Sequence, residues 1–300
     1  MQEKSVLTKE ERRARREAKR EKQREQNLGR SKKMHVARIE FERQPESQRL
    51  SPDNASKKKF TQYHVGCSGW FYWHWRENFY VNLPSKDWFN QYSSQFNTVE
   101  LNAPFYSWPT MPTVKTWISQ IGKQKFVYTV KVCELITHIR RFKRTKQLVK
   151  DFGLIADLLG SHMGCFLFQL PPSYHFTPGH LKDVLSQLDH QRRNVVEFRH
   201  RSWWNEQVYN AFRQTNTIFC SCSGPRLPDE LIKTADDIYI RFHGTTQWYR
   251  HDYTRDELAI WVKRIKESEA KQVWAYFNND RNEYAITNAK EFLKQLKKKP

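Results

Sequence analysis

Eight short apolar segments between residues 60 and 300 each end in polar or charged residues, and most are followed by a stretch with the apolar spacing of a helix. Alternating strand and helix patterns are typical of βαβ units and predict a parallel sheet. Eight units in roughly 240 residues have the size of a closed (β/α)8 barrel, a TIM-like fold with its chemistry at the C-terminal strand ends. The predicted strands are Tyr63–Trp70, Thr98–Asn102, Phe126–Val132, Cys165–Pro171, Asn194–His200, Thr217–Ser223, Asp237–Gly244 and Val273–Asp280.

Side chains along each predicted strand alternate between two faces, which in a barrel are the lumen and the helix layer. In the second predicted strand, Glu100 and Asn102 share the face opposite Val99 and Leu101. The same alternation collects polar residues of the other strands on one face or at the strand ends. With Glu100 and Asn102, these are Lys131, Gln169, Glu197, Arg199, Arg241, His243 and Asn279.

This polar set has two interpretations. Unpaired buried charges are very costly, so the groups are expected to meet one another, water or a ligand. Three cations against two carboxylates favour an anionic ligand, because the guanidinium fork matches phosphate or carboxylate geometry. The alternative is an ion-pair network that only fills the centre of the barrel.

The enzyme interpretation gives each residue a role. Lys131, Arg199 and Arg241 are expected to hold an anionic group of the substrate. Glu100 or Glu197 is expected to act as general acid or base, with His243 as a second proton-transfer group. The amides of Asn102, Gln169 and Asn279 are candidate substrate contacts.

A metal site is the weaker alternative. Glu100, Glu197, His243 and Asp280 come from different strands and offer ligands for a hard or borderline ion. The interleaved cations would repel a divalent ion, so no metal ligand is predicted. The sequence identifies no cofactor.

Large aromatic residues follow several predicted strands, at the end where the polar residues gather. They are expected either to pack into a lid over the barrel mouth or to stack on a sugar or nucleobase. Trp70 and Tyr106 are the candidates for contact with substrate.

Residues 1–59 form a basic extension and linker outside the predicted barrel domain of residues 60–300. They contain 19 Lys and Arg against 10 Asp and Glu, in a chain of net charge +20. The segment Thr8–Arg24 has strong helix propensity but no apolar stripe, which predicts a solvated helix or disordered arm that buries no face on the barrel. Leu50–Lys59 is the predicted linker. Such an arm either binds nucleic acid through its phosphates or serves only solubility.

No run of about 18 apolar residues occurs and the N-terminus has no signal-like apolar stretch, so no membrane partner is predicted. All five cysteines fall on or beside predicted strands, and their odd number fits reduced thiols in a cytoplasmic protein. The sequence does not predict the oligomeric state.

Several motifs occur in order along the barrel region. They are Gly66–Trp70, Val99–Asn102 with Phe105 and Tyr106, Lys131 with Thr137 and His138, Leu167–Pro172, Glu197–His200 with Ser202 and Trp203, Arg241–Gly244, and Tyr276–Asn279 with Asn288 and Ala289. In these motifs the chain resembles the domain-of-unknown-function 72 family, also called YecE-like proteins. The resemblance implies a TIM-like barrel, but it implies no reaction.

Two classes of function therefore remain open. The first is an enzyme that hydrolyses phosphate esters or nucleic acid and takes an anionic small molecule as ligand. The second is a non-catalytic nucleic-acid-binding protein that uses the basic arm. A sugar or sugar-acid isomerase fits the fold and the aromatics, but no motif supports it.

Overall fold

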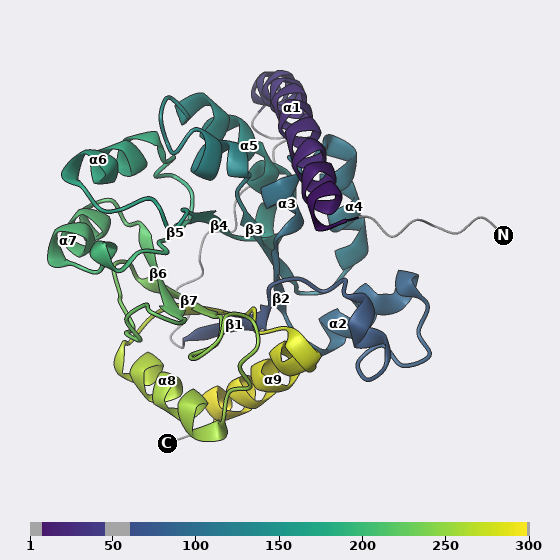
Figure 1. The fold of residues 1–300 in the computed structure, drawn as a ribbon, viewed down its shortest axis with the longest axis vertical. Coiled ribbons are helices and arrows are strands. Elements are labelled where there is room, and N and C mark those ends of the chain that lie inside the picture. Colours follow the sequence, from purple (N-terminus) through teal and green to yellow (C-terminus); the bar gives the residue numbers. More distant parts are fainter. Residues whose placement is uncertain (1–7, 46–60, 299–300) are drawn as a thin grey trace.

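The computed structural model of the chain describes residues 8–45 and 61–298, and within these ranges it shows a nearly closed barrel of eight parallel strands (Figure 1). The predicted TIM-like architecture is confirmed. Every predicted strand overlaps an observed one, although most observed strands end earlier because the polar ends continue as loops. The strands are β1 (Gln62–Cys67), β2 (Thr98–Leu101), β3 (Val127–Lys131), β4 (Met163–Gln169), β5 (Asn194–Glu197), β6 (Ile218–Ser223), β7 (Asp237–Phe242) and β8 (Gln272–Phe277).

Helices surround the strands and cover their outward faces (Figure 1). Several begin at sites that the sequence marks clearly: Thr110 and Thr177 cap helices that carry proline in the first turn, and Thr254 forms a capping box with Glu257. The helices are α1 (Lys9–Glu42), α2 (Trp88–Gln95), α3 (Ala103–Tyr106), α4 (Met111–Ile121), α5 (Lys146–Leu159), α6 (Pro178–Gln187), α7 (Glu206–Gln214), α8 (Arg255–Glu267) and α9 (Tyr284–Lys297). None of the described helices is both long and apolar enough to cross a membrane.

The strand order runs β1-β8-β7-β6-β5-β4-β3-β2, so β1 and β2 form the seam of the barrel. The two strands approach closely at Gly66, where an added Cβ would lie 2.3 Å from the Thr98 carbonyl oxygen. The Tyr92 hydroxyl bridges the seam: it donates to the Thr98 carbonyl at 3.0 Å and accepts from the Cys67 amide at 2.8 Å. Glycine is therefore required at this position by the close approach of another backbone.

The lumen is layered along its axis. Toward the N-terminal ends of the strands it is filled by buried apolar side chains and aromatic rings, and toward the C-terminal ends by charged groups. The buried apolar and aromatic members are Cys165, Leu167, Val195, Ile218, Cys220, Tyr239, Trp274 and Tyr276, whereas Cys222 reaches the charged layer beside Glu197 and His243.

The N-terminal extension contains one long helix, α1, whose two halves differ. Residues 10–22 are exposed on every side, which agrees with the solvated helix predicted for Thr8–Arg24. The second half, for which no contact with the barrel was predicted, packs against α5, with Asn27, Ser31, Met34 and Arg38 buried. The predicted linker Leu50–Lys59 lies outside the described residues.

Candidate functional site

The C-terminal ends of β2, β5 and β7 bring three predicted residues into one buried network. Arg241 lies between two carboxylates: its Nη2 is 2.5 Å from Glu100 Oε1 and its Nη1 is 2.5 Å from Glu197 Oε2. The Tyr239 hydroxyl donates to the other Glu100 oxygen at 2.5 Å. Glu100, Glu197 and Arg241 are fully buried, so each charge is satisfied by the others rather than by bulk water.

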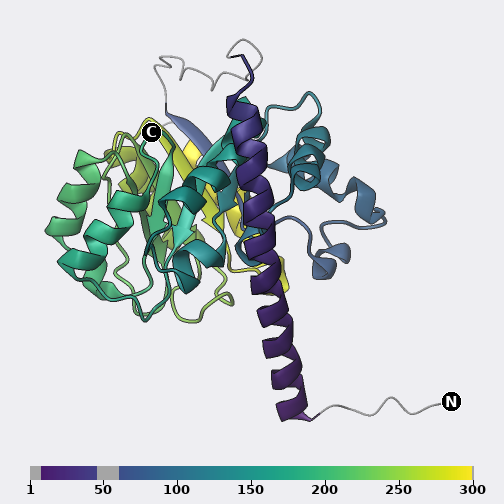
Figure 2. The ribbon, with the colours of Figure 1, turned by 90° about the horizontal axis from the view of Figure 1, so that it is seen from above.

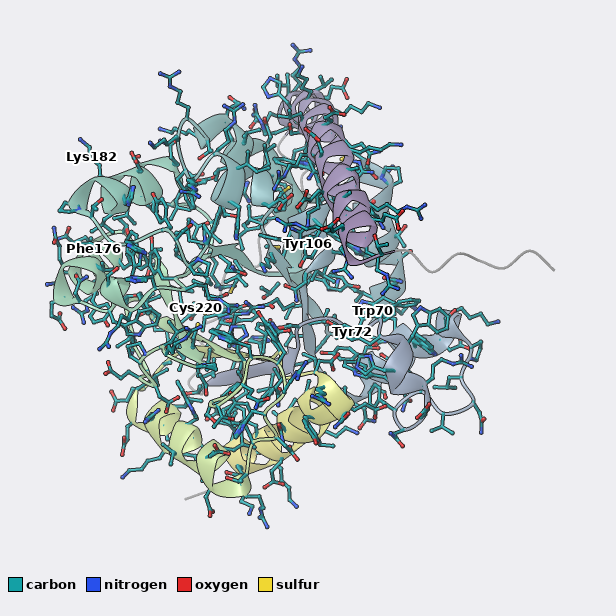
Figure 3. The ribbon with its side chains drawn as sticks, viewed as in Figure 1. Trp70, Tyr72, Tyr106, Phe176, Lys182 and Cys220 are labelled. Carbon is teal, nitrogen blue, oxygen red and sulfur yellow. The ribbon has the colours of Figure 1, made fainter. Side chains whose placement is uncertain are left out.

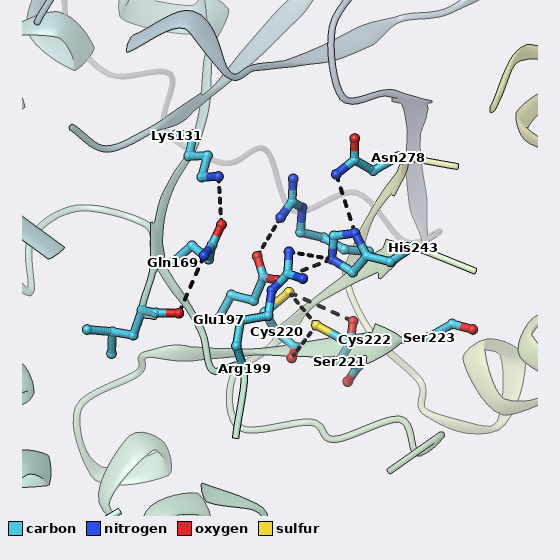
Figure 4. Close-up of polar contacts among 12 residues, drawn as sticks. Lys131, Gln169, Glu197, Arg199, Cys220, Ser221, Cys222, Ser223, His243 and Asn278 are labelled. Carbon is cyan, nitrogen blue, oxygen red and sulfur yellow. Dashed lines mark hydrogen bonds and ion pairs between the residues drawn. The ribbon is translucent and has the colours of Figure 1, made fainter. Parts of the chain in front are cut away.

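Two further side chains contact the second oxygen of Glu197, Oε1 (Figure 4). Arg199 Nε pairs with Oε1, and His243 Nε2 lies 3.2 Å from the same oxygen. Burial alone would raise the pKa of Glu197, but Arg199 and Arg241 outweigh it and hold the pKa well below its usual range. Glu197 is therefore ionised near neutral pH and has no proton to donate.

His243 is neutral in this environment. Burial, together with the charges of Arg199 and Arg241, keeps its pKa well below the ordinary value. The Asn278 amide nitrogen lies 3.3 Å from His243 Nδ1, and Nε2 lies 3.2 Å from both Glu197 Oε1 and Arg199 Nη2.

Lys131, at the end of β3, stands apart from this network (Figure 4). Its Nζ donates to Gln169 Oε1 at 2.6 Å and lies 4.1 Å from the centre of the Phe105 ring. None of the described carboxylates forms an ion pair with it. Burial, and then the charge of Arg241, lowers the pKa of Lys131 to about 7. This lysine is consequently balanced between its charged and neutral forms at neutral pH.

Besides Lys131 and Gln169, four of the predicted contact residues lie outside the charged network. The Asn102 amide donates to the Ser68 carbonyl at 2.8 Å, and the Asn279 amide donates to the His251 carbonyl at 2.8 Å, so both tie loops together. Trp70 packs edge-on against aromatic neighbours near α2, and Tyr106 lies beside α1 with 59% of its surface exposed (Figure 3). The geometry of Asn102 and Asn279 thus supports a structural role.

Three residues of the site are not among the predicted site residues. Tyr239 shares the lumen face of β7 with Arg241, so the alternation along that strand could have identified it. Phe105 belongs to a recognised motif, but nothing in the sequence places its ring under Lys131. Trp248 covers the network: its ring lies 4.6 Å from the Arg199 guanidinium carbon and 5.4 Å from the His243 ring.

A cavity of about 890 Å³ opens beside Trp248, between the loops that follow β1, β7 and β8. His74 and Asp280 line it and pair at 2.9 Å, and Asp280 also accepts from the Trp75 indole nitrogen at 2.8 Å. Burial raises the pKa of Asp280 to about 6. A second cavity, of about 1350 Å³, lies at the opposite end of the barrel.

The metal set considered from the sequence is not assembled, because Asp280 pairs with His74 outside the network. Among the described residues, one group has suitable ligand atoms within 4.8 Å of one another: Glu197, Cys222 and His243. Both oxygens of Glu197 are already bonded to arginines, and two cations beside the group oppose a divalent ion. The donor set therefore does not fit a metal.

The family described as "Protein of unknown function DUF72" matches residues 64–300, and the chain belongs to this family. The curated relative "UPF0759 protein YunF" of Bacillus subtilis (strain 168) is 26% identical over 241 residues, which cover 68% of this chain and 85% of that protein.

Two solved structures of the family are similar to this chain. The DUF72 family protein TM1631 of Thermotoga maritima MSB8 has a TM-score of 0.72 and 25% identity, covering 79% of this chain and 100% of that one. The protein EF0366 of Enterococcus faecalis V583 has a TM-score of 0.68 and 17% identity, covering 80% of this chain and 97% of that one, and shows the fold alone.

Proposed function

We propose that the protein binds an anionic, phosphate-bearing ligand at the C-terminal face of the barrel, in contact with Lys131. The observation that carries this proposal is that Lys131 is buried beside Arg199 and Arg241 and has no carboxylate partner among the described residues. A phosphate placed against Nζ would supply the missing counter-charge. Further donors are offered by the guanidinium of Arg199, whose charge acts on Lys131, and by the amide of Gln169, whose oxygen is bonded to Nζ.

The proposal extends to hydrolysis of a phosphate ester by general acid and base catalysis. Every oxygen of Glu100 and Glu197 is bonded, which favours an electrostatic role that orients Arg241. Proton transfer then falls to His243, which is neutral near pH 7, or to the fraction of Lys131 that is neutral there.

The binding step is tested by calorimetric titration of inorganic phosphate in two buffers of different ionisation enthalpy. Binding should be accompanied by proton uptake near pH 7.5, because an anion beside Lys131 raises its pKa from about 7. Lys131→Gln should lose the uptake and bind at least about tenfold more weakly. The control Lys271→Gln removes an exposed lysine from the opposite end of the barrel and should bind like the wild type.

Equal phosphate affinity in all three proteins, with no proton uptake, would exclude Lys131 as the anion contact.

The hydrolytic step is tested separately with p-nitrophenyl phosphate. Turnover that disappears in a folded Lys131→Ala variant supports it, whereas binding without turnover restricts the function to binding.

Nucleic-acid binding through α1 is the second candidate function. The observation that favours it is the exposure of residues 10–22, a segment rich in Arg and Lys that packs against no other described part of the chain. In this function the buried network is structural, and the phosphate contacts come from the arm.

We place the protein in a reducing compartment such as the cytoplasm. The five cysteines are all buried and unpaired, with Sγ of Cys220 and Cys222 3.8 Å apart and not bonded. Unpaired thiols are the usual state in that compartment.

A further inference from the structure

The exposed half of α1 projects past the C-terminal rim of the barrel, beside its mouth (Figures 1 and 2). The helix crosses the rim of that face at Asn27, whose amide donates to the Tyr106 carbonyl at 3.0 Å and whose oxygen accepts from the Trp108 amide at 2.8 Å. These backbone groups follow β2 directly, so they mark its C-terminal end. Beyond Asn27 the helix extends past the barrel (Figure 2), by roughly 20 Å for residues 9–22.

The side chains of α1 that face the barrel form one stripe at helical spacing. In the docked half this stripe contains the partly buried Gln23 and the buried Asn27, Ser31, Met34 and Arg38, at intervals of three or four residues. The same spacing continues toward the N-terminus as Arg20, Arg16 and Arg12. These three residues, called here the arginine stripe, therefore project from the barrel-facing side of the helix.

Charge is separated around the projecting half. Glu10, Glu17, Glu21 and Glu25 share another face, roughly 135° around the helix from the arginine stripe. Arg12, Arg16 and Arg20 form no ion pair with any described residue. The helix thus turns a basic surface toward the barrel mouth and an acidic one away from it.

A second basic surface meets the first at the rim. The segment 140–146, called here the basic rim loop, follows β3 and η4 (Leu135–Ile139), and its charged residues are exposed. Arg24 of α1 lies 3.6 Å from Glu134 at the start of this region, which brings helix and loop together. The charged residues of the loop are Arg140, Arg141, Lys143, Arg144 and Lys146.

We propose that a single-stranded nucleic acid binds in the angle between the projecting half of α1 and the C-terminal rim. Its phosphates contact the arginine stripe and the basic rim loop, and a base stacks on the exposed Tyr106 ring at the junction. This proposal rests on the second candidate function and gives it a defined surface. The arginine stripe has no apolar residue to insert into a lipid surface, which disfavours a membrane as the partner.

The test uses the full chain and fluorescently labelled 20-nucleotide oligo-U and oligo-dT, with anisotropy measured at several salt concentrations. The stripe variant is Arg12→Gln with Arg16→Gln and Arg20→Gln. The matched control, Arg15→Gln with Lys19→Gln and Lys22→Gln, removes the same charge from a face roughly 100° around the same helix. Circular dichroism checks that the helix persists in both variants.

The stripe variant should bind at least about tenfold more weakly, and the slope of log affinity against log salt should fall by about 2 for three lost phosphate contacts. The control should lose less than about threefold. Tyr106→Ala should weaken oligonucleotide binding while leaving the affinity for inorganic polyphosphate, which has no base, unchanged. A preference for either sugar supports the proposal, because the phosphates and the stacked base are common to both.

Equal losses in the stripe and control variants would overturn the proposed surface but leave nucleic-acid binding intact. Absence of oligonucleotide binding by the wild type at 50 mM salt would reject the surface and the second candidate function together. Binding of poly-glutamate as tightly as of the oligonucleotides would identify an acidic protein as the partner and also overturn the proposal.

Discussion

Among individual residues, Arg241 carries the strongest constraint. It is fully buried, it pairs with carboxylates from two different strands, and both of those carboxylates have further partners. Removing one member of a buried ion pair leaves the other charge uncompensated, which costs far more than the pair itself contributes. The network is therefore intolerant of single changes.

Glu100→Gln should lower the free energy of unfolding by about 3–5 kcal/mol, because Arg241 then keeps one carboxylate only. Urea unfolding measures the change. The control Glu206→Gln breaks the exposed pair with Arg213, 3.4 Å apart, and should change stability by less than about 0.5 kcal/mol. Similar effects of the two substitutions would contradict the buried network.

Lys131 should make stability depend on pH. Its pKa is about 7 in the folded protein and about 10.5 in the unfolded chain, so between these values the unfolded state binds more protons. The lysine therefore destabilises the fold most below pH 7, and this cost disappears as the pH rises toward 10.5. Lys131→Met should be more stable than the wild type by a few kcal/mol at pH 6.

The advantage of Lys131→Met should shrink steadily when urea unfolding is repeated at pH 8 and 9.5. A difference that is constant across this range would mean that the lysine is not desolvated. Lys271→Met is the control, since its exposed ammonium group should produce no such convergence.

The sequence predicted the charged network because lumen residues recur at every second position of a strand. That argument needs only the alternation, and it would have added Tyr239 as well. It could not distinguish residues that contact a substrate from residues that hydrogen-bond loops together. Asn102 and Asn279 are polar residues at strand ends, like the residues of the charged network. Their role depends on loop geometry, which a two-residue period does not describe.

Among the elements, α1 shows why a polar helix can dock. Its buried stripe contains Asn27, Ser31 and Arg38, and Met34 is its one buried apolar residue. Met34 and the partly buried Ala37 and Phe41 pack against the hydrophobic core. Hydrogen bonds add to this contact: Arg38 Nε donates to Asp151 at 2.8 Å, and the Asn27 amide donates to the Tyr106 carbonyl. An apolar-stripe criterion detects only part of this docked face, because it does not count the buried polar residues.

Asn27→Ala should detach this helix in part. It leaves the Tyr106 carbonyl and the Trp108 amide without their partner, at a cost of about 1–3 kcal/mol for each buried group. Hydrogen exchange at the Trp108 amide should accelerate, and the melting temperature should fall. Gln26→Ala, one residue away on the exposed side, should preserve both properties.

At the scale of the whole molecule, the fold was predictable because eight strand patterns in about 240 residues leave few alternatives to a closed barrel. The seam between β1 and β2 was not predictable. Its closure depends on the Tyr92 hydroxyl and on the missing side chain of Gly66, and neither changes the hydrophobic pattern.

Gly66→Ala should destabilise the entire barrel, because its Cβ would overlap the backbone of the neighbouring strand. We expect a loss of about 3 kcal/mol or more in the free energy of unfolding, as for overpacked cores. Gly29→Ala is a matched control in α1 with no atom near the added Cβ, and it should stabilise the helix by about 0.5–1 kcal/mol. Equal melting temperatures for the two variants would contradict the tight seam.

The guanidinium group of Arg241 joins strands on both sides of the barrel mouth, so the groups nearest the proposed ligand are also those that hold the ring together. Substitutions that alter the chemistry of this site would therefore destabilise the fold before they changed the function. Diversification within the family should for that reason occur in the surrounding loops and in added segments such as α1, while the central charges stay fixed.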